Sequence, residues 1–436
     1  MPRRCDVCIV NAHSYCNKGD AAILECMIRS LDAAFDGARF TVLSDTPEVD
    51  ARAYRDIRVL GIRYPWVSSR FAFSTKLQAL GYHLRFWLAA LCIERMSGPR
   101  GRHWAERIAG ADTAETLSAI ANSDIVISCG GGYINSTGKL FTRLSLALVG
   151  KCFGKPVVFY SQSVSDLLSR YHRSLARWAV NHCDLFIARE RITVSYLDAL
   201  GADLGRVVLR PDIAFTLPMI NRASAVERLE STGVLEKPRM GVTVTRWNFP
   251  GHANWRELVK NYEAAMRRLV TYATDALGYG VYVFPQVTGP SAYSDDRTYS
   301  ARLFEGMSRV HVLRQDYSPE ELKGLVGLMD VFVGTRMHSV IFALGAMVPT
   351  LAIAYQDKTV GLMNDLGLRD WVVNMSEVDG DVLTAALRRL GEGAAVYRDI
   401  LAEAIPKLAR EADVASADCR RVYDSVLANS AGDCGV

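Results

Sequence analysis

Three side chains that can bind an anion and move a proton lie within a short stretch of the chain, at Arg336, His338 and Lys358. Arginine binds carboxylates and phosphates through two parallel hydrogen bonds, and lysine binds them as a point charge. Histidine holds a proton that it can transfer near neutral pH. His338 alone is more typical of a structural histidine. Together, the three side chains predict a site for a negatively charged ligand with an acid beside it.

The residues around this set predict a strand, a tight turn, a short helix and a second strand. The three apolar segments are 331–333, 339–346 and 350–355, and the middle one has helical spacing. Arg336 and His338 therefore lie at a helix N-terminus, where exposed amides favour an anion. Ligands of open α/β sheets bind at the carboxyl ends of the strands, and Lys358 lies just past the second strand. We expect the three side chains to converge on one cleft.

Further candidate residues follow other predicted strands, and several have a structural alternative. The residues expected to line the cleft are Asn17, Asp20, Gly130, Gly131, Gly132, Gln162 and Gln286. Asp20 is also typical of a helix N-cap, and three glycines at a strand end also suit an ordinary turn. Arg189 either binds a ligand or pairs with Glu190 inside the fold. No Gly-x-Gly-x-x-Gly dinucleotide motif and no metal-ligand cluster is present, so neither a redox cofactor nor a metal is expected.

The pattern of strands and helices predicts two doubly wound, Rossmann-like α/β domains that face a cleft. A chain of 436 residues, half of them hydrophobic, is long enough for two domains. We expect an N-terminal domain over residues 1–220, a link near 219–238, a C-terminal domain over 238–395, and helices with a tail over 396–436. The ten cysteines are scattered and suit buried thiols. No signal peptide and no apolar run of about 18 residues is present, which favours a cytoplasmic protein.

The positive charge is concentrated in one segment. Residues 51–110 contain eleven Lys or Arg and three acids, a net charge of +8, whereas the other residues sum to −4. Lys76–Met96 is apolar with few charges, and aromatic residues precede it at Tyr64, Trp66, Phe71 and Phe73. Residues 64–107 therefore predict an interfacial helix on an anionic membrane, with peripheral contact to the inner face of the cell membrane. The alternative is a buried helix whose arginines contact solvent.

The chain resembles the polysaccharide pyruvyl transferase family. The segments that carry the resemblance are Asn17-Lys-Gly-Asp-Ala-Ala-Ile-Leu24, 124–132, Ala188-Arg-Glu190, Pro211-Asp-Ile-Ala-Phe215, Gly334–Leu344 and Ala354-Tyr-Gln-Asp-Lys358. The resemblance implies a fold like that of GT-B glycosyltransferases and phosphoenolpyruvate as donor. It implies transfer of pyruvate, as a ketal, onto two hydroxyls of a sugar in a cell-surface polysaccharide or its lipid-linked precursor.

The resemblance also implies roles for particular residues. Arg189, Arg336 and Lys358, with Ser339, hold the carboxylate and phosphate of the donor, and His338 is the acid. Pro211-Asp-Ile-Ala stands where many family members read Asp-Pro-Ala, so the role of Asp212 stays open. Residues 51–110 carry no family motif. Phosphoenolpyruvate is a co-substrate, and no further cofactor or nucleic acid is implied.

Two other functions fit the same pattern. A GT-B-type glycosyltransferase would share the fold and a cation in the cleft, but would bind a nucleotide sugar and not phosphoenolpyruvate. A non-catalytic glycan-binding protein would keep the fold without needing Arg336, His338 and Lys358 together.

Overall fold

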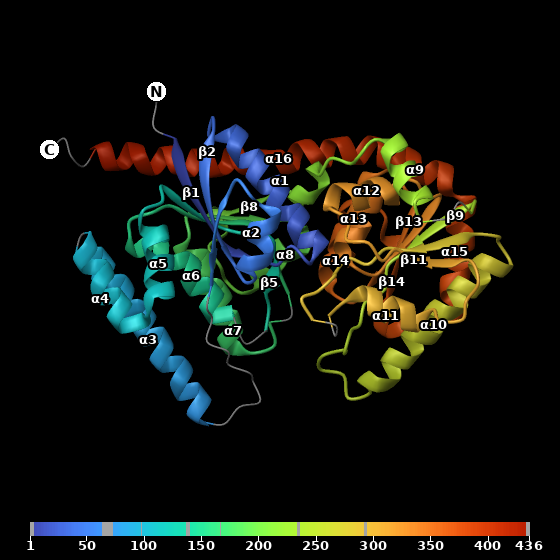
Figure 1. Cartoon of the computed structure of the whole chain (residues 1–436), viewed down its shortest axis with the longest axis horizontal. Helices are drawn as coiled ribbons and strands as arrows, with labels where there is room; N and C mark the ends of the chain where they lie inside the picture. The colour runs from blue at the N-terminus through green and yellow to red at the C-terminus, as the bar shows by residue number, and fades with distance from the viewer. Residues whose placement is uncertain are drawn as a thin grey trace. The chain divides into compact units, whose positions relative to one another are not determined.

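The computed structural model of the chain describes residues 4–62, 73–96, 98–136, 140–165, 167–232, 236–291 and 294–432, with backbone alone for 73–79 and 430–432. These residues form two units, each built on one parallel sheet (Figure 1). The first unit comprises Met1–Tyr15, Ile23–Ile213 and Glu411–Val436, and the second comprises Cys16–Ala22 and Ala214–Arg410. The predicted class of two doubly wound α/β units is confirmed.

The sheet of the first unit has the order β3-β2-β1-β4-β6-β7-β8, with β5 paired to β6. Its strands are β1 (Cys5–Ala12), β2 (Ala38–Ser44), β3 (Arg58–Gly61), β4 (Ile125–Ser128), β5 (Gly131–Ile134), β6 (Val157–Val164), β7 (Leu185–Ala188) and β8 (Val207–Leu209). Its helices are α1 (Lys18–Ala34), α2 (Pro47–Ala53), α3 (Phe73–Arg95), α4 (Pro99–Ala109), α5 (Ala111–Ala121), α6 (Leu140–Cys152), α7 (Arg170–His182) and α8 (Arg191–Ala199). The sheet order reverses between β1 and β4.

The sheet of the second unit has the order β11-β10-β9-β12-β13-β14 and reverses between β9 and β12. Its strands are β9 (Arg239–Val242), β10 (Gly280–Val283), β11 (Val310–Val312), β12 (Val331–Gly334), β13 (Thr350–Ala354) and β14 (Val372–Asn374). Its helices are α9 (Arg222–Glu230), α10 (Trp255–Asp275), α11 (Asp296–Leu303), α12 (Pro319–Val326), α13 (Met337–Gly345), α14 (Asp357–Asp365) and α15 (Gly380–Glu392).

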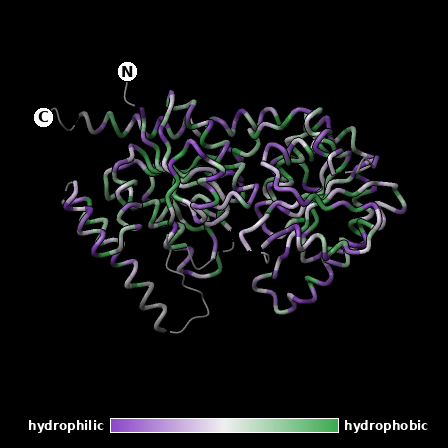
Figure 2. Tube along the Cα trace, in the orientation of Figure 1, coloured by the Kyte–Doolittle hydropathy of each residue, from purple (hydrophilic) through white to green (hydrophobic). Residues whose placement is uncertain are grey.

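The central strands are buried along their length because helices cover both faces of a parallel sheet. All eight residues of β6 are buried, as are all four of β4 and of β12. Hydrophobic segments accordingly gather at the centre of each unit (Figure 2). Cys5 and Cys8 lie buried in β1 and burial raises the pKa of each thiol to about 12, so they are core residues of a strand.

The structure divides the chain differently from the predicted boundaries. The expected link at 219–238 contains helix α9, and the short strands β3, β5 and β14 were not predicted. The C-terminal residues form one long helix, α16 (Ala394–Gly432), that contributes to both units. Tyr397 of α16 donates a hydrogen bond to the carbonyl of Thr350 in the second unit (2.9 Å). Further along α16, the Ser416 hydroxyl lies 2.9 Å from that of Tyr160 in the first unit.

Candidate active site

The strongest candidate site lies where the sheet order of the second unit reverses. Strands β9 and β12 are neighbours there, but the chain continues from them in opposite directions across the sheet. The connections that follow such strands diverge and leave a crevice at their carboxyl ends, where ligands of doubly wound folds bind. Arg336 is the N-cap residue of α13, directly after β12. The predicted strand, turn and helix around Arg336 and His338 are confirmed.

Hydrogen bonds from buried side chains fix the turn that carries Arg336. Thr335 is fully buried, and its hydroxyl donates to the carbonyl of Thr243 at the end of β9 (2.9 Å). Its backbone N–H donates to the Thr243 hydroxyl (3.0 Å). The hydroxyl of buried Tyr262 lies 3.0 Å from that of Thr335. The two strands at the reversal point are therefore tied together immediately before Arg336.

Asp296 orients the guanidinium of Arg336. The Arg336 Nε donates to one carboxylate oxygen at 2.7 Å and Nη2 donates to the other at 2.6 Å. The backbone N–H groups of Gln286 and Val287 also donate to Asp296, at 3.1 and 2.9 Å. Burial alone would lower the pKa of Arg336, but Asp296 and then Tyr355 raise it. A guanidinium has five N–H donors, so this pair leaves donors on Arg336 for a ligand.

A segment from the start of the chain packs against His338. The backbone of Gly19 lies so close that a Cβ atom there would be 2.3 Å from the His338 Nδ1. This segment, Cys16–Ala22, belongs to the second unit. The N–H of Lys18 donates to the carbonyl of Gln286 at 2.8 Å, and Asn17 forms a β-bridge with Val287. Glycine is required at position 19 because any side chain would displace the imidazole.

Asn17 and Asp20 interact at the start of α1, in the same segment. The Asn17 amide donates to the Asp20 carboxylate at 2.6 Å, and the Asn17 Oδ1 accepts from the N–H of Gly19 at 3.2 Å. The side chain that caps α1 is thus Asn17, whereas Asp20 was the residue with the predicted N-cap signature. Both residues lie beside Gly19, which contacts His338.

Two buried polar side chains next to this segment differ in their partners. Gln286 is 1% exposed, and neither polar atom of its side chain has a hydrogen-bond partner among the residues that the structure describes. The sequence analysis did not single out Lys18, although it is also 1% exposed, and its Nζ lies 2.8 Å from Asp316. In the sequence Lys18 was only one cation of the Asn17–Leu24 motif, because its burial depends on residues far along the chain, such as Gln286 and Asp316.

Ser339 and Lys358 occupy different settings in the second unit. The Ser339 hydroxyl is fully buried, donates to the Arg336 carbonyl at 2.6 Å and lies 2.8 Å from the Thr243 hydroxyl. It supports the turn from inside. Lys358 lies half-buried in the first turn of α14, after β13, as its position in the sequence predicted. In the same unit, the ring centroids of Tyr355 and Trp247 lie 4.5 Å apart and form an aromatic pair that was not predicted from the sequence.

A model of the family described as polysaccharide pyruvyl transferase matches residues 17–357, from the Asn17 segment to the residue before Lys358. The chain belongs to the polysaccharide pyruvyl transferase family. The amylovoran biosynthesis protein AmsJ of Erwinia amylovora is 23% identical over 387 residues, which cover 86% of this chain and 90% of AmsJ. Family membership identifies the chain as a transferase of polysaccharide biosynthesis.

Solved structures with the same fold include an epimerase and two further proteins, two of the three with a UDP-sugar bound. A UDP-GlcNAc 2-epimerase from Neisseria meningitidis bound to UDP-GlcNAc has a TM-score of 0.54 and 12% identity, over 96% of this chain and 99% of that chain. Anabaena HepE in complex with UDP-glucose has a TM-score of 0.55 and 12% identity, over 98% of this chain and 99% of that chain. A glycosyltransferase from Rickettsia africae has a TM-score of 0.55 and 10% identity, over 98% of this chain and 99% of that chain. At these identities the likeness shows the fold alone. The predicted GT-B-like class is confirmed.

Arg189 lies in the first unit, whereas Arg336 and His338 lie in the second. Its side chain is fully buried. The Nε lies 2.8 Å from the Glu190 carboxylate and Nη1 lies 2.7 Å from that of Asp212. This agrees with the structural alternative, in which Arg189 pairs with Glu190. Asp212, whose role the sequence left open, is the second carboxylate that pairs with Arg189.

The predicted glycines and Gln162 also lie in the first unit, at the carboxyl ends of β4 and β6. A Cβ atom on Gly130 would lie 2.8 Å from Ile23, and Gly131 has a φ of +153°, so close packing and backbone conformation both favour glycine. The amide of Gln162 is buried and donates to the carbonyl of Cys129 at 2.7 Å. Gly132 lies in β5.

A polar cluster that the sequence analysis missed lies at the reversal point of the first sheet. Arg143 of α6 pairs with Asp45 at 2.8 Å, and its Nη1 lies 3.2 Å from the Nε2 of His13. The Arg143 guanidinium also lies over the ring of Tyr133, 5.1 Å from its centroid. His13 directly follows β1 and Asp45 directly follows β2. These positions at strand ends were the only sequence signal that could have marked them as candidate site residues.

No group of three or more His, Cys, Asp or Glu side chains among the described residues is placed to hold a metal ion. No helix in the described part of the chain is both long and apolar enough to cross a membrane.

Proposed function

We propose that the enzyme transfers pyruvate from phosphoenolpyruvate to a saccharide and forms a ketal with two of its hydroxyls. One observation carries the proposal: an arginine oriented by Asp296 and a histidine held by the Gly19 segment share one turn at the reversal point of the second sheet. Phosphoenolpyruvate carries a carboxylate and a phosphate on the same carbon, which suits an arginine together with a lysine.

In this mechanism His338 protonates the terminal methylene carbon of the donor, which becomes the methyl group of pyruvate. The adjacent carbon gains cationic character and is attacked by one sugar hydroxyl, whose proton returns to His338. A second hydroxyl of the sugar then displaces phosphate, and its proton leaves with the phosphate. The products are the ketal and inorganic phosphate. No electrons are exchanged with a redox partner, and phosphoenolpyruvate serves as co-substrate.

In this proposal Arg336 and Lys358 bind the donor, and Ser339 supports the turn. Arg189 is assigned a structural role because its guanidinium already faces two carboxylates in a fully buried position. Gly130, Gly131, Gly132 and Gln162 stay predictions for the acceptor side. The acceptor is proposed to be a sugar of a polysaccharide or of its lipid-linked precursor, which accords with the role in amylovoran biosynthesis that the name of AmsJ states.

The test is incubation of the protein with phosphoenolpyruvate and a panel of free and lipid-linked saccharides. We expect phosphate release that depends on the saccharide, together with a pyruvate ketal detected on the product by mass spectrometry and NMR. Phosphate release without a ketal would indicate hydrolysis of the donor. If the protein binds UDP-sugars and not phosphoenolpyruvate, the proposal is wrong and a glycosyltransferase is the better assignment.

A further inference from the structure

Helix α3 carries apolar side chains on two opposite faces. Its inner face includes Phe86, Ala89 and Ala90, which are buried in the core of the first unit. Its outer face, called here the leucine face, consists of Leu80, Leu84, Leu88 and Leu91, whose exposed fractions are 65%, 60%, 43% and 50%. At about 100° per residue these leucines fall within an arc of about 80°, on the side opposite the buried residues.

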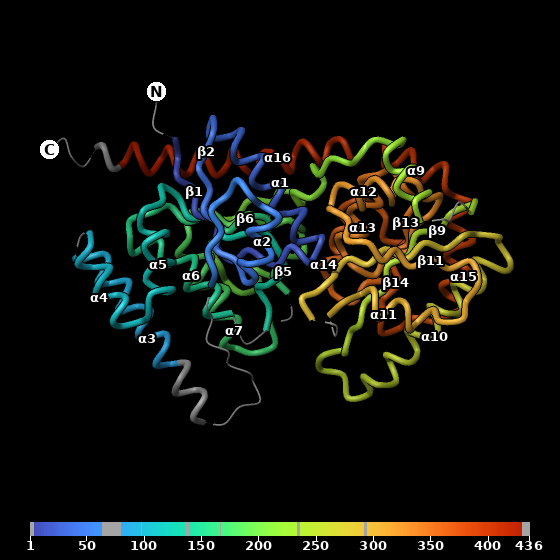
Figure 3. Tube along the Cα trace, viewed as in Figure 1, coloured from blue at the N-terminus to red at the C-terminus, as the bar shows by residue number. Residues whose placement is uncertain are grey.

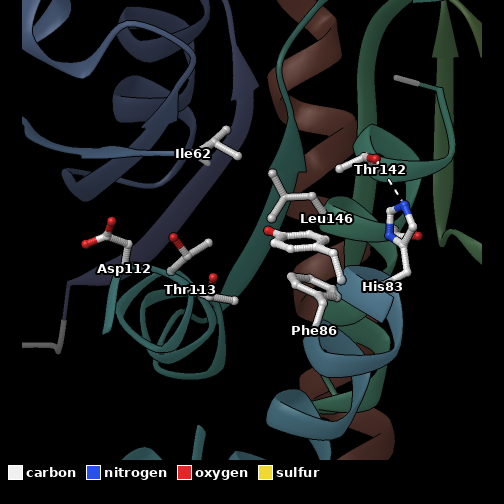
Figure 4. Close-up of a pocket in the computed structure, with 10 residues that line it drawn as sticks. Ile62, His83, Phe86, Asp112, Thr113, Thr142 and Leu146 are labelled. Atoms are coloured by element: carbon white, nitrogen blue, oxygen red, sulfur yellow. Dashed lines mark hydrogen bonds between the residues drawn. The ribbon is translucent and has the colours of Figure 1, made fainter. Parts of the chain in front are cut away.

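The inner face shows that α3 is fixed to the fold without help from the leucines. α3 packs against α4, α5 and α6, as the traces in Figure 3 show for α3 and α4. His83 and Phe86 point into a small cavity whose wall includes Thr142 and Leu146 (Figure 4). Burial there lowers the pKa of His83. The structural alternative of a buried helix is therefore correct for one side of α3 only.

Exposed arginines lie on α3 and on the neighbouring helix α4. On α3, Arg85 and Arg95 are exposed. On α4, the exposed residues Arg100, His103, Trp104 and Arg107 share one face, and the Arg107 guanidinium lies 5.7 Å from the centroid of the Trp104 ring. In an interfacial helix, leucine side chains enter the acyl-chain region of the membrane, and arginine and tryptophan side chains lie at the lipid headgroups. The aromatic residues Tyr64, Trp66 and Phe71 of the sequence prediction lie outside the described residues, and of Phe73 only the backbone is described.

We propose that the leucine face of α3 binds an anionic lipid surface, with the arginines of α3 and α4 at the lipid headgroups. Charge selects this occupant. A second copy of the chain would bring the exposed arginines of α3 and α4 against their own copies, because twofold interfaces pair identical patches. An anionic bilayer neutralises that charge and covers the leucines at the same time. This inference depends on exposure and charge, and it stands whether or not the enzyme uses phosphoenolpyruvate.

The test is co-sedimentation of the full chain with vesicles of phosphatidylcholine alone or mixed with phosphatidylglycerol. We expect binding to the anionic vesicles that weakens as salt is raised, and little binding to the neutral ones. Replacing Leu84 and Leu88 by glutamine should weaken binding about tenfold or more, because apolar burial drives interfacial binding. Replacing Arg100 and Arg107 by glutamine should weaken it about 30-fold at low salt, since each arginine near an anionic surface contributes about fivefold to binding.

Matched controls separate the face from general surface changes. Leu204 and Leu427 are exposed leucines elsewhere, and Arg177 and Arg222 are exposed arginines elsewhere, so their glutamine variants should bind vesicles normally. All variants should keep the Tm of the parent protein. Equal binding of neutral and anionic vesicles, or unchanged binding by the Leu84 and Leu88 variant, would overturn the proposal. So would a dimer in sedimentation velocity that those same two substitutions dissociate.

Discussion

Arg189 and Arg336 occupy equivalent places in the two units, each between a parallel strand and the helix that follows, yet their surroundings differ. Arg189 follows β7, faces the carboxylates of Glu190 and Asp212, and is fully buried. Arg336 follows β12 at the reversal point of its sheet, pairs with one carboxylate, and keeps 21% of its side chain exposed. An arginine enclosed by two acids is part of the structure, whereas one with a single acid and access to solvent can still bind an anion.

The largest expected effect is on stability, from Arg189→Ala. This change leaves two carboxylates buried without their cation, and breaking a buried ion pair costs about 3–5 kcal/mol. Denaturant unfolding should show the loss. The matched change Arg336→Ala should cost clearly less, because two backbone N–H groups still donate to Asp296. If both variants lose the same free energy of unfolding, the distinction between a structural Arg189 and a ligand-binding Arg336 is wrong.

The next effect is on turnover, from His338→Ala. We expect it to lose about 100-fold or more in kcat, the range for removal of a general acid, while donor affinity stays near that of the parent protein. Single-turnover kinetics and calorimetric titration with phosphoenolpyruvate measure the two quantities. Near-normal turnover in a folded His338→Ala protein would show that the proton comes from another group.

A third effect is on donor binding, from Arg336→Ala. Loss of charge-assisted hydrogen bonds to the donor should weaken phosphoenolpyruvate binding by about 10- to 100-fold. Arg336→Lys should restore only part of this affinity, because lysine cannot form the two-pronged contact with Asp296 or the donor. An Arg336→Lys protein with full affinity would mean that charge alone matters at this position.

The smallest effect concerns the segment that packs on His338. Gly19→Ala should lower turnover by about tenfold, because a Cβ within 2.3 Å of the imidazole must move it out of position. In a His338→Ala background the same change should cost little, which a double-mutant cycle measures. Gly81→Ala is the control, since nothing lies within 4 Å of a Cβ there. If the losses in turnover from Gly19→Ala and His338→Ala are additive, Gly19 does not act through His338.

Sequence alone determined the local elements. The strands around 331–333 and 350–355 and the helix between them follow from apolar runs and periodicity, which act over a few residues. The motif around Arg336 and His338 was also sufficient to indicate the family. By contrast, the domain boundaries were less predictable, because α16 is one continuous helix whose two halves pack into different units.

Tertiary structure decided which of those residues work together. Asp296 reaches Arg336 across 40 residues of sequence, and Gly19 reaches His338 from the start of the chain. Asp212 encloses Arg189 in the same way, so two arginines with similar local sequence acquire different roles. The two faces of α3 were likewise indistinguishable in an apolar stretch. Periodicity in the sequence indicates a helix or a strand. Which of its side chains are buried or paired depends on the elements that pack beside it, and long-range packing decides this.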